Sequence, residues 1–317
     1  MLKPSVARLC DAYDAALLDL DGVLYLGPDP VPHAAEAVST ARAAGMRTAF
    51  VTNNASRRPA AVAEHLTELG IPAEREDVVT SGQAAVRWLQ ARLDAGVKVL
   101  VLGSAGLAEE VEAGGFTPVR QADGAAAVVQ GLEPRTAWTD LAEAAIAIEA
   151  GALWVAGNAD ATYPSPRGLL PGNGALVQAL VHTTGERPVV VGKPEPELHR
   201  ASVERVRAQH PLVVGDRLDT DVLGANRAGT DSLLVLTGVT RREELLTAAP
   251  ELRPTYLSSD LRGLVTTHPA VVVDGAAASC GQARAWFDAG QVRGSDDSDD
   301  ALRARCALAW SVTSSFS

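Results

Sequence analysis

Two aspartates stand close together near the start of the chain, in the stretch LLDLDG at residues 17–22. The apolar residues before Asp19 are typical of a buried strand, and Asp21 follows after a single leucine. Two carboxylates at a strand end repel each other unless a cation or a proton lies between them. Gly22 permits a turn there, and carboxylate oxygens are ligands that Mg²⁺ prefers. The Asp19 and Asp21 pair is therefore a candidate site for a divalent cation.

More acids follow a second apolar run, in the stretch GDRLDTD at residues 215–221. Asp216 comes directly after a strand expected at residues 212–215, and Asp221 lies about one helical turn further on. Together with Asp19 and Asp21, these acids would crowd one region of the molecule. A bound metal ion is the natural way to offset such crowding, so the four aspartates predict a site for Mg²⁺.

Two other stretches contain the groups that a phosphate ester needs. In VTNNAS, Thr52 has a hydroxyl group, and Asn53 and Asn54 have amides near the start of an expected helix, whose dipole favours anions. In VVVGKPEP, Lys193 stands between a glycine and a proline, a rigid setting that can aim one ammonium group. Each motif by itself is ordinary loop chemistry. Their joint occurrence with the acids predicts a site for metal and phosphate.

The elements that must position these residues follow an α/β pattern. Short runs rich in valine and leucine alternate with alanine-rich helical stretches, as in a parallel sheet covered on both faces. We expect strands at residues 15–20, 47–52, 212–215 and 233–237, each followed by a polar or glycine-containing loop. In a doubly wound, Rossmann-like sheet, the loops after the strand ends converge on one crevice where ligands bind.

A second α/β unit is expected inside the first, since apolar runs at residues 97–103, 125–131 and 153–158 interleave with helical stretches. We predict a core domain at residues 1–80 and 189–264, with an inserted α/β cap domain at residues 81–188. Residues 265–317 change in character and end in a helical pattern at residues 301–310. This C-terminal extension has no assigned role, and the sequence assigns it to neither domain.

Composition excludes several classes of function. The chain has 317 residues, of which 47% are hydrophobic and 4% aromatic, so aliphatic globular cores are expected. The net charge of −11 argues against a general surface for nucleic acid or anionic membranes. No apolar run is long enough to span a bilayer, and three widely spaced cysteines favour neither a disulfide framework nor a zinc site. A cytoplasmic protein without a membrane span is expected.

The four motifs together resemble those of the haloacid dehalogenase-like (HAD-like) phosphatase superfamily. The matching residues are DLDGV at 19–23, Thr52 with its asparagines, Lys193, and GDRLDTD at 215–221. The likeness covers roughly residues 13–264 and is strongest to the subgroup with a large α/β cap. Within that subgroup, residues 151–180 and 213–229 look like the glycerol 3-phosphate phosphatases of actinobacteria.

By this resemblance, Asp19 is the nucleophile that attacks phosphorus, and Asp21 protonates the leaving alcohol and then activates water. The resemblance also implies that Mg²⁺ binds the side chains of Asp19 and Asp216 and the carbonyl of Asp21, while Asp221 orients metal-bound waters. The residues expected to hold the phosphoryl oxygens are Thr52, Asn53, Asn54 and Lys193. The implied reaction is hydrolysis of glycerol 3-phosphate, released from glycerophospholipid polar heads, through an aspartyl-phosphate.

The cap is expected to select the leaving group and to offer a surface for a homodimer. Its candidate substrate contacts are Asn158, Asp160, Tyr163 and Arg167, which flank a loop rich in proline and glycine and are equally common turn formers or caps. Asp160→Ala should therefore change the ranking of substrates.

Alternative functions differ in substrate or in class. Phosphoglycolate, pyridoxal phosphate or nitrophenyl phosphate could be the substrate instead. Asp21 counts against a dehalogenase, and the large cap counts against a phosphomutase. A receiver-like or phosphate-binding module is disfavoured by the insertion and by the DxDG spacing.

Overall fold

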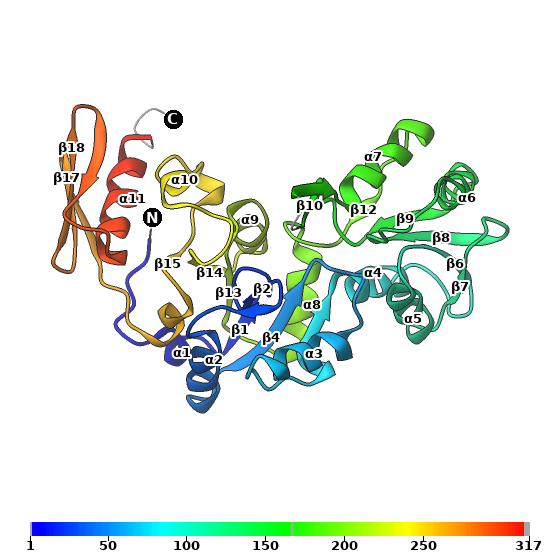
Figure 1. Cartoon of the computed structure of the whole chain (residues 1–317), viewed down its shortest axis with the longest axis horizontal. Helices are drawn as coiled ribbons and strands as arrows, with labels where there is room; N and C mark the ends of the chain where they lie inside the picture. The colour runs from blue at the N-terminus through cyan, green and yellow to red at the C-terminus, as the bar shows by residue number, and fades with distance from the viewer. Residues whose placement is uncertain (1, 166–167, 314–317) are drawn as a thin grey trace. The chain divides into compact units, whose positions relative to one another are not determined.

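The computed structural model describes residues 2–165 and 168–313 and divides into two compact units (Figure 1). The first unit comprises the described residues of Met1–Phe50, Leu66–Pro72 and Ser202–Ser317, and the second comprises Val51–His65 and those of Ala73–Ala201. The fold is α/β, with parallel sheets and intervening helices, as predicted.

The first unit is built on a parallel sheet with the order β15-β14-β13-β1-β4. Its strands are β1 (Ala15–Leu18), β4 (Arg47–Thr52), β13 (Pro211–Gly215), β14 (Asp231–Val235) and β15 (Tyr256–Ser258). The last two residues of β4 are counted with the second unit. All four residues of β1 are buried, as expected for a central strand with both faces covered. The predicted strands are confirmed, although β1 ends at Leu18 and β14 ends at Val235, each two residues before the expected end.

At β1 the order of strands in this parallel sheet changes side, since β4 lies on one side of β1 and β13 on the other. Leu18 pairs with Phe50 of β4 on one side and with Val214 of β13 on the other. The loops after β1 and β13 therefore leave the same edge of the sheet from neighbouring strands. Such a switch point is where open α/β sheets bind their ligands.

The second unit contains a five-stranded parallel sheet with the order β12-β9-β8-β6-β7. Its strands are β6 (Lys98–Leu102), β7 (Thr117–Val119), β8 (Ala125–Gln130), β9 (Leu153–Ala156) and β12 (Val189–Val190). Helices α6 (Trp138–Glu149) and α7 (Asn173–Thr184) share a core with it that includes Leu100, Val128 and Trp154. This sheet confirms the three predicted strands between residues 97 and 158.

The C-terminal extension is a folded part of the first unit. An antiparallel sheet of β16 (Val271–Asp274), β17 (Ala277–Cys280), β18 (Ala283–Asp288) and β19 (Gln291–Gly294) packs against α11 (Asp299–Thr313) (Figure 1). Leu302, Cys306 and Trp310 of α11 pack in turn against Leu234 of β14 and Leu257 of β15. Because this cluster spans the extension and the parallel sheet, both form one hydrophobic core.

Other helices and short strands complete the described chain. They are α1 (Leu9–Ala12), β2 (Tyr25–Leu26), β3 (Asp29–Pro30), α2 (Ala34–Ala43), α3 (Pro59–Glu68), η1 (Arg75–Asp77), β5 (Val78–Thr80), α4 (Ser81–Gln90), α5 (Ala105–Ala113), β10 (Thr162–Ser165), β11 (Gly168–Pro171), α8 (Pro196–Val206), η2 (Leu218–Val222), α9 (Leu223–Ala228), α10 (Arg242–Leu246), η3 (Pro250–Leu252) and η4 (Leu261–Val265).

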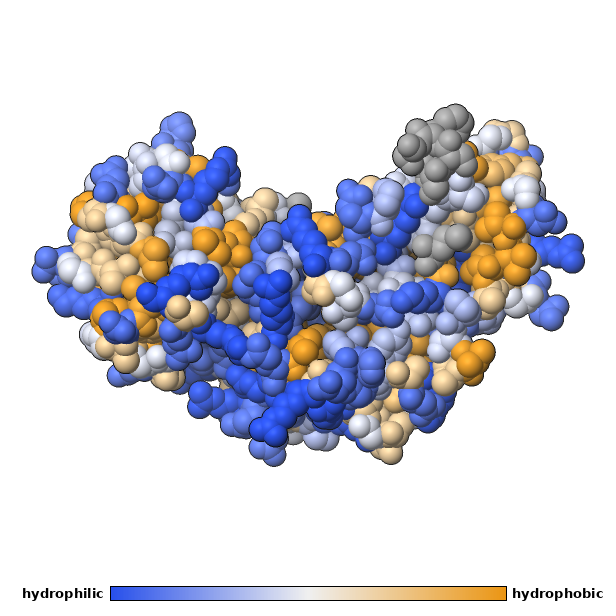
Figure 2. Space-filling model, turned by 180° about the vertical axis from the view of Figure 1, so that it is seen from behind, coloured by the Kyte–Doolittle hydropathy of each residue, from blue (hydrophilic) through white to orange (hydrophobic). Residues whose placement is uncertain are grey.

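Much of the surface seen in Figure 2 is polar, although 47% of the residues are hydrophobic. On the face shown in Figure 2, hydrophilic side chains predominate and hydrophobic ones lie in separate areas. Among the described residues, no helix combines the length and the apolar character needed to cross a bilayer.

Candidate active site

Two of the predicted acids emerge from neighbouring strands at the switch point. Asp19 follows β1, and its main-chain N–H donates to the carbonyl of Val214, 2.8 Å away, which extends the pairing with β13. Asp216 follows Gly215 at the end of β13. Parallel pairing of the two strands therefore brings the two acids to one edge of the sheet.

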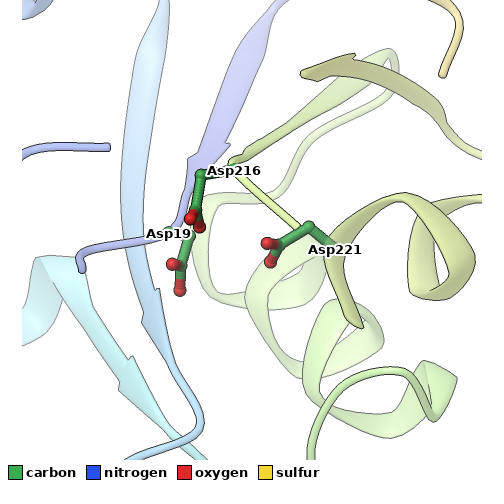
Figure 3. A group of neighbouring side chains, drawn as sticks. All are labelled: Asp19, Asp216 and Asp221. Carbon is green, nitrogen blue, oxygen red and sulfur yellow. The ribbon is translucent and has the colours of Figure 1, made fainter. Parts of the chain in front are cut away.

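Three carboxylates converge at this edge. Asp19, Asp216 and Asp221 each place an oxygen within 4.8 Å of the others, and Figure 3 shows the side chain of Asp221 pointing toward the other two. Asp216 and Asp221 are each only 1% exposed. Burial of several carboxylates is costly unless a cation offsets their charge, and an all-oxygen donor set suits a hard divalent cation. The described residues thus fit Mg²⁺.

Asp21 takes a different position from the other three acids. Its side chain is exposed, and its carboxylate is not part of the converging group. Its main chain bridges to Tyr25, and the next residue, Gly22, donates its N–H to the carbonyl of Tyr25 at 2.8 Å. This turn separates Asp21, which solvent can reach, from the buried pair.

Close main-chain approaches fix the buried carboxylates. A Cβ added to Gly22 or Gly238 would lie 2.5 Å or 2.0 Å from Oδ2 of Asp216, and one added to Gly215 would lie 2.2 Å from Cβ of Asp221. Only glycine permits these distances, so the acids are set by the backbone around them.

The loop after β14 supports Asp216 and was not assigned to the site from the sequence. The N–H of Val239 donates to Oδ2 of Asp216 at 2.6 Å, and the hydroxyl of Thr237 donates to the carbonyl of Gly22. The sequence predicts a loop after the strand expected at residues 233–237, at the same sheet edge as the acids. The position of this loop, TGVT at residues 237–240, was the signal that could have assigned it to the site.

Asp221 lies in an unusual helical segment, η2, whose five residues form a π-helix before α9. Its Oδ2 accepts the N–H of Arg217 at 3.2 Å. Single π-helical turns inside helices are rare and often occur at functional sites.

The predicted phosphate-binding residues lie in the second unit. Thr52 ends β4, and its hydroxyl oxygen accepts the N–H of Asn54 at 3.0 Å. Oδ1 of Asn54 accepts both the N–H and the hydroxyl of Ser56, which makes it part of its own turn. Thr52 is 5% exposed and Lys193 is 4% exposed.

The side chain of Asn53 brings Lys193 to the same loop. Its Oδ1 accepts the N–H of Lys193 at 2.7 Å, and its Nδ2 donates to the carbonyl of Lys193 at 3.0 Å. Nδ2 of Asn158 donates to the carbonyl of Asn53 at 2.8 Å. The structure thus joins three of the predicted residues in one hydrogen-bonded group.

The other cap candidates lie nearby in the chain. Asp160 is half-buried, and its N–H donates to Oδ1 of Asn158 at 3.2 Å. Tyr163 on β10 is 44% exposed. Arg167 lies outside the described residues. Asn173, which the sequence reasoning did not single out, donates from Nδ2 to the carbonyl of Asn158 at 2.7 Å.

Comparison with known proteins places these motifs in context. A family model described as haloacid dehalogenase-like hydrolase matches residues 16–117, and a second, described as HAD-hydrolase-like, matches residues 190–264. A D-glycerol 3-phosphate phosphatase of Mycobacterium tuberculosis is 52% identical over 257 residues, which cover 81% of this chain and 72% of the relative. A 5′-nucleotidase of Bacillus subtilis is 38% identical over 236 residues, which cover 74% of this chain and 91% of the relative.

Solved structures extend the likeness to the C-terminal extension. A crystal structure of a glycerol phosphate phosphatase from Mycobacterium tuberculosis in complex with magnesium matches with a TM-score of 0.85 and 45% identity. The match covers 96% of this chain and 93% of that chain.

Proposed function

Because the chain belongs to the haloacid dehalogenase-like hydrolases, we propose that it is a Mg²⁺-dependent phosphatase that hydrolyses glycerol 3-phosphate to glycerol and phosphate. The observation that carries the activity is the convergence of Asp19, Asp216 and Asp221, since phosphoryl transfer depends on positioning and on offsetting charge. The 52% identity to the D-glycerol 3-phosphate phosphatase of Mycobacterium tuberculosis supports the substrate.

Mg²⁺ would be held by the side chains of Asp19 and Asp216 and by the main-chain carbonyl of Asp21. When bound, it offsets the charge of the carboxylates and of the phosphoryl oxygens. Asp221, which is buried in this group and whose Oδ2 accepts the N–H of Arg217, would orient the metal-bound waters.

The reaction would proceed in two displacements at phosphorus. A carboxylate oxygen of Asp19 forms a bond to phosphorus while the bond from phosphorus to the alcohol oxygen breaks, and Asp21 supplies the proton that this oxygen takes up. Asp21 then accepts a proton from water as the water oxygen attacks phosphorus and the bond to Asp19 breaks. The exposed carboxyl group of Asp21 suits this task, because both alcohol and water must reach it.

The phosphoryl oxygens would be held by the loop after β4 together with Lys193. Thr52 supplies a hydroxyl group, Asn53 and Asn54 supply main-chain amides, and Lys193 supplies an ammonium group. These groups would offset the negative charge that spreads over the oxygens in the transition state.

Substrate choice would belong to the inserted domain, for which we keep the predicted limits of residues 81–188. Asp160 is its candidate substrate contact; Asn158, also predicted as one, donates from Nδ2 to the carbonyl of Asn53. A panel of glycerol 3-phosphate, phosphoglycolate, pyridoxal phosphate, nitrophenyl phosphate and a 5′-nucleotide, compared by kcat/KM, tests the assignment. Glycerol 3-phosphate should rank first; a higher kcat/KM for another physiological ester would contradict the proposed substrate.

Asp19→Asn tests the chemical step. The variant keeps the shape of the side chain but removes the nucleophilic oxygen charge, so turnover should be lost while the circular dichroism spectrum stays unchanged. Asp274→Asn, at the exposed end of β16, is the matched control. Near-normal activity of Asp19→Asn would remove Asp19 from the nucleophile role.

Location and assembly complete the proposal. All three cysteines lie in the part of the chain that the structure describes, where they are buried and form no disulfide. Cysteines that stay as thiols are typical of a reducing compartment, which supports a cytoplasmic location. We also propose a homodimer through the inserted domain. Cell fractionation and light scattering of the purified protein test these two points.

A further inference from the structure

The side-chain amide of Asn53 is engaged at both ends by the main chain of Lys193. Oδ1 accepts the Lys193 N–H at 2.7 Å and Nδ2 donates to the Lys193 carbonyl at 3.0 Å. This arrangement repeats the two-way exchange of a hydrogen-bonded residue pair in antiparallel strands. It fixes the main chain at the residue that carries the ammonium group.

The approach of Asn53 to this segment requires the glycine before Lys193. A Cβ on Gly192 would lie 2.6 Å from Oδ1 of Asn53 and 2.2 Å from the carbonyl oxygen of Gly157. Gly192 therefore leaves the space in which the side-chain amide of Asn53 reaches the main chain of Lys193.

A second set of contacts holds Asn53 itself. Its carbonyl accepts Nδ2 of Asn158 at 2.8 Å and the hydroxyl of Ser81 at 2.7 Å. The carbonyl of Asn158 accepts Nδ2 of Asn173 at 2.7 Å. Asn158 is 6% exposed, Asn173 is 1% exposed and Ser81 is fully buried.

The burial of these amides gives each hydrogen bond more weight than a surface contact has. Removal of one partner leaves a buried polar group unsatisfied, which costs roughly 1–3 kcal/mol. Hydrogen-bonded networks in a low-dielectric interior favour one geometry. In this network Oδ1 of Asn173 is buried without a hydrogen-bond partner among the described residues, so the contact of Asn173 is made through Nδ2. The chain of contacts runs from Asn173 at the start of α7, through Asn158 and Asn53, to Lys193.

We infer that Asn173, Asn158 and Asn53 form a positioning relay that holds Lys193 for the phosphoryl group, an inference that rests on the proposed phosphatase function. Asn158 then acts through Lys193 and not by contact with the leaving group. Its removal should weaken the handling of every phosphate ester alike, whatever alcohol the ester contains.

Asn158→Ala and Asn173→Ala test the relay by steady-state kinetics. With glycerol 3-phosphate and with nitrophenyl phosphate, kcat/KM should fall by the same factor, about 5- to 150-fold for the loss of one buried hydrogen bond. Inhibition by inorganic phosphate should weaken in parallel. Gln178→Ala, an exposed amide on the same helix as Asn173, is the matched control and should leave all values unchanged.

A double-variant cycle separates the relay from general damage. Lys193→Met keeps a side chain of similar length without the ammonium group. If Asn158 acts through Lys193, Asn158→Ala in the Lys193→Met background should cause little further loss of phosphate binding. Full additivity of the two losses would overturn the relay.

Hydrogen exchange supplies a readout that does not depend on activity. In the unliganded protein, the amide of Lys193 should exchange at least about 10-fold faster in Asn53→Ala and Asn158→Ala than in the wild type, as expected for a bond worth more than 1.4 kcal/mol. Asn158→Asp, which keeps the size and the Oδ1 acceptor but loses the Nδ2 donor, should show the same effect if the alanine variant is poorly folded.

The outcomes distinguish this inference from the proposed function. Wild-type protein that releases phosphate from none of the esters would refute the phosphatase, whatever the exchange data show. A phosphatase in which Asn158→Ala alters only the ranking of esters, with Lys193 exchange and phosphate inhibition unchanged, would refute the relay and make Asn158 a substrate contact. Faster exchange without weaker phosphate inhibition would also refute it.

Discussion

The main chain of Gly22 lies so close to Asp216 that an added Cβ would stand 2.5 Å from Oδ2 of that carboxylate. The turn after Asp21 therefore packs directly against the buried carboxylate of Asp216. This contact couples the geometry of the DxDG stretch to that of the GDRLDTD stretch, although almost two hundred residues separate them in the chain.

Gly22→Ala should therefore disable the site. Gly22 has a φ of +84°, so the new side chain meets backbone strain as well as the carboxylate. A shift of about 1 Å at a catalytic group can cost roughly 100-fold in rate, and we expect a loss of kcat of that order. Gly27→Ala is the control, because Gly27 also has a positive φ but no described atom would lie within 4 Å of its Cβ. Equal kcat values for the two variants would show that the Asp216 contact is unimportant.

Asp221→Ala should weaken the dependence of activity on Mg²⁺. The side chain is buried beside Asp19 and Asp216, so its loss removes one of three charges that favour a cation. The Mg²⁺ concentration for half-maximal activity should rise by about 10- to 100-fold, and a chelator should abolish the activity of wild type and variant alike. Asp219→Ala, two residues away and paired with Arg217 at the surface, should leave the Mg²⁺ titration unchanged. Indistinguishable titrations for the two variants would exclude Asp221 from the site.

His268 should make the first unit less stable in acid. Burial, followed by the charge of Arg303, lowers the pKa of His268 from 6.5. Nη2 of Arg303 donates to Nδ1 at 3.1 Å, so Nε2 carries the hydrogen and donates to the Gly263 carbonyl at 2.8 Å. Asp300 accepts from the same guanidinium at 2.6 Å, which holds the cation in place.

The direction of the pH effect follows from the lowered pKa. Above pH 6.5, His268 is neutral in both the folded and the unfolded protein. Below pH 6.5, His268 binds a proton in the unfolded chain but stays neutral in the folded protein. The free energy of unfolding therefore falls by at most about 1.4 kcal/mol for each pH unit. Urea unfolding at pH 7.5 and pH 5.5 should show this loss in wild type and a smaller one in His268→Asn. His182→Asn, an exposed histidine on α7, should behave as wild type. An identical acid response of His268→Asn and wild type would contradict this role.

Trp310→Ala should destabilise the first unit as a whole and not only the extension. Trp310 is 1% exposed, packs in the cluster that contains Leu234 and Leu257, and donates from Nε1 to the Leu245 carbonyl at 2.8 Å. Loss of a buried tryptophan costs about 3–5 kcal/mol of unfolding free energy, measured by urea unfolding. Trp286→Ala on the outer face of the C-terminal sheet, where the tryptophan is 42% exposed, should cost far less. Similar values for both variants would mean that the extension is not part of the core.

The sequence by itself determined the local features of this protein. The aliphatic runs specify strands because β-branched and leucine side chains fill a sheet buried on both faces, and Asp19 and Asp216 stand directly after such runs. Parallel strands leave the sheet at a common edge, so the convergence of these acids could be predicted without knowledge of any contact. The loop after β14 was expected at the same edge, but the contacts of Gly238 and Val239 with Asp216 could not be predicted, since neither residue has a side chain with chemical function.

Tertiary structure alone decided which polar groups meet. The amides of Asn53 and Asn158 were predicted to face the substrate, yet the hydrogen bonds described for them join them to one another and to the main chain of Lys193, 140 residues beyond Asn53. The extension, which the sequence assigned to neither domain, shares a core with β14 and β15. The physical reason is the same in both cases: a buried side chain takes the partner that folding places beside it, and that choice depends on packing across distant segments, which no local pattern of residues encodes.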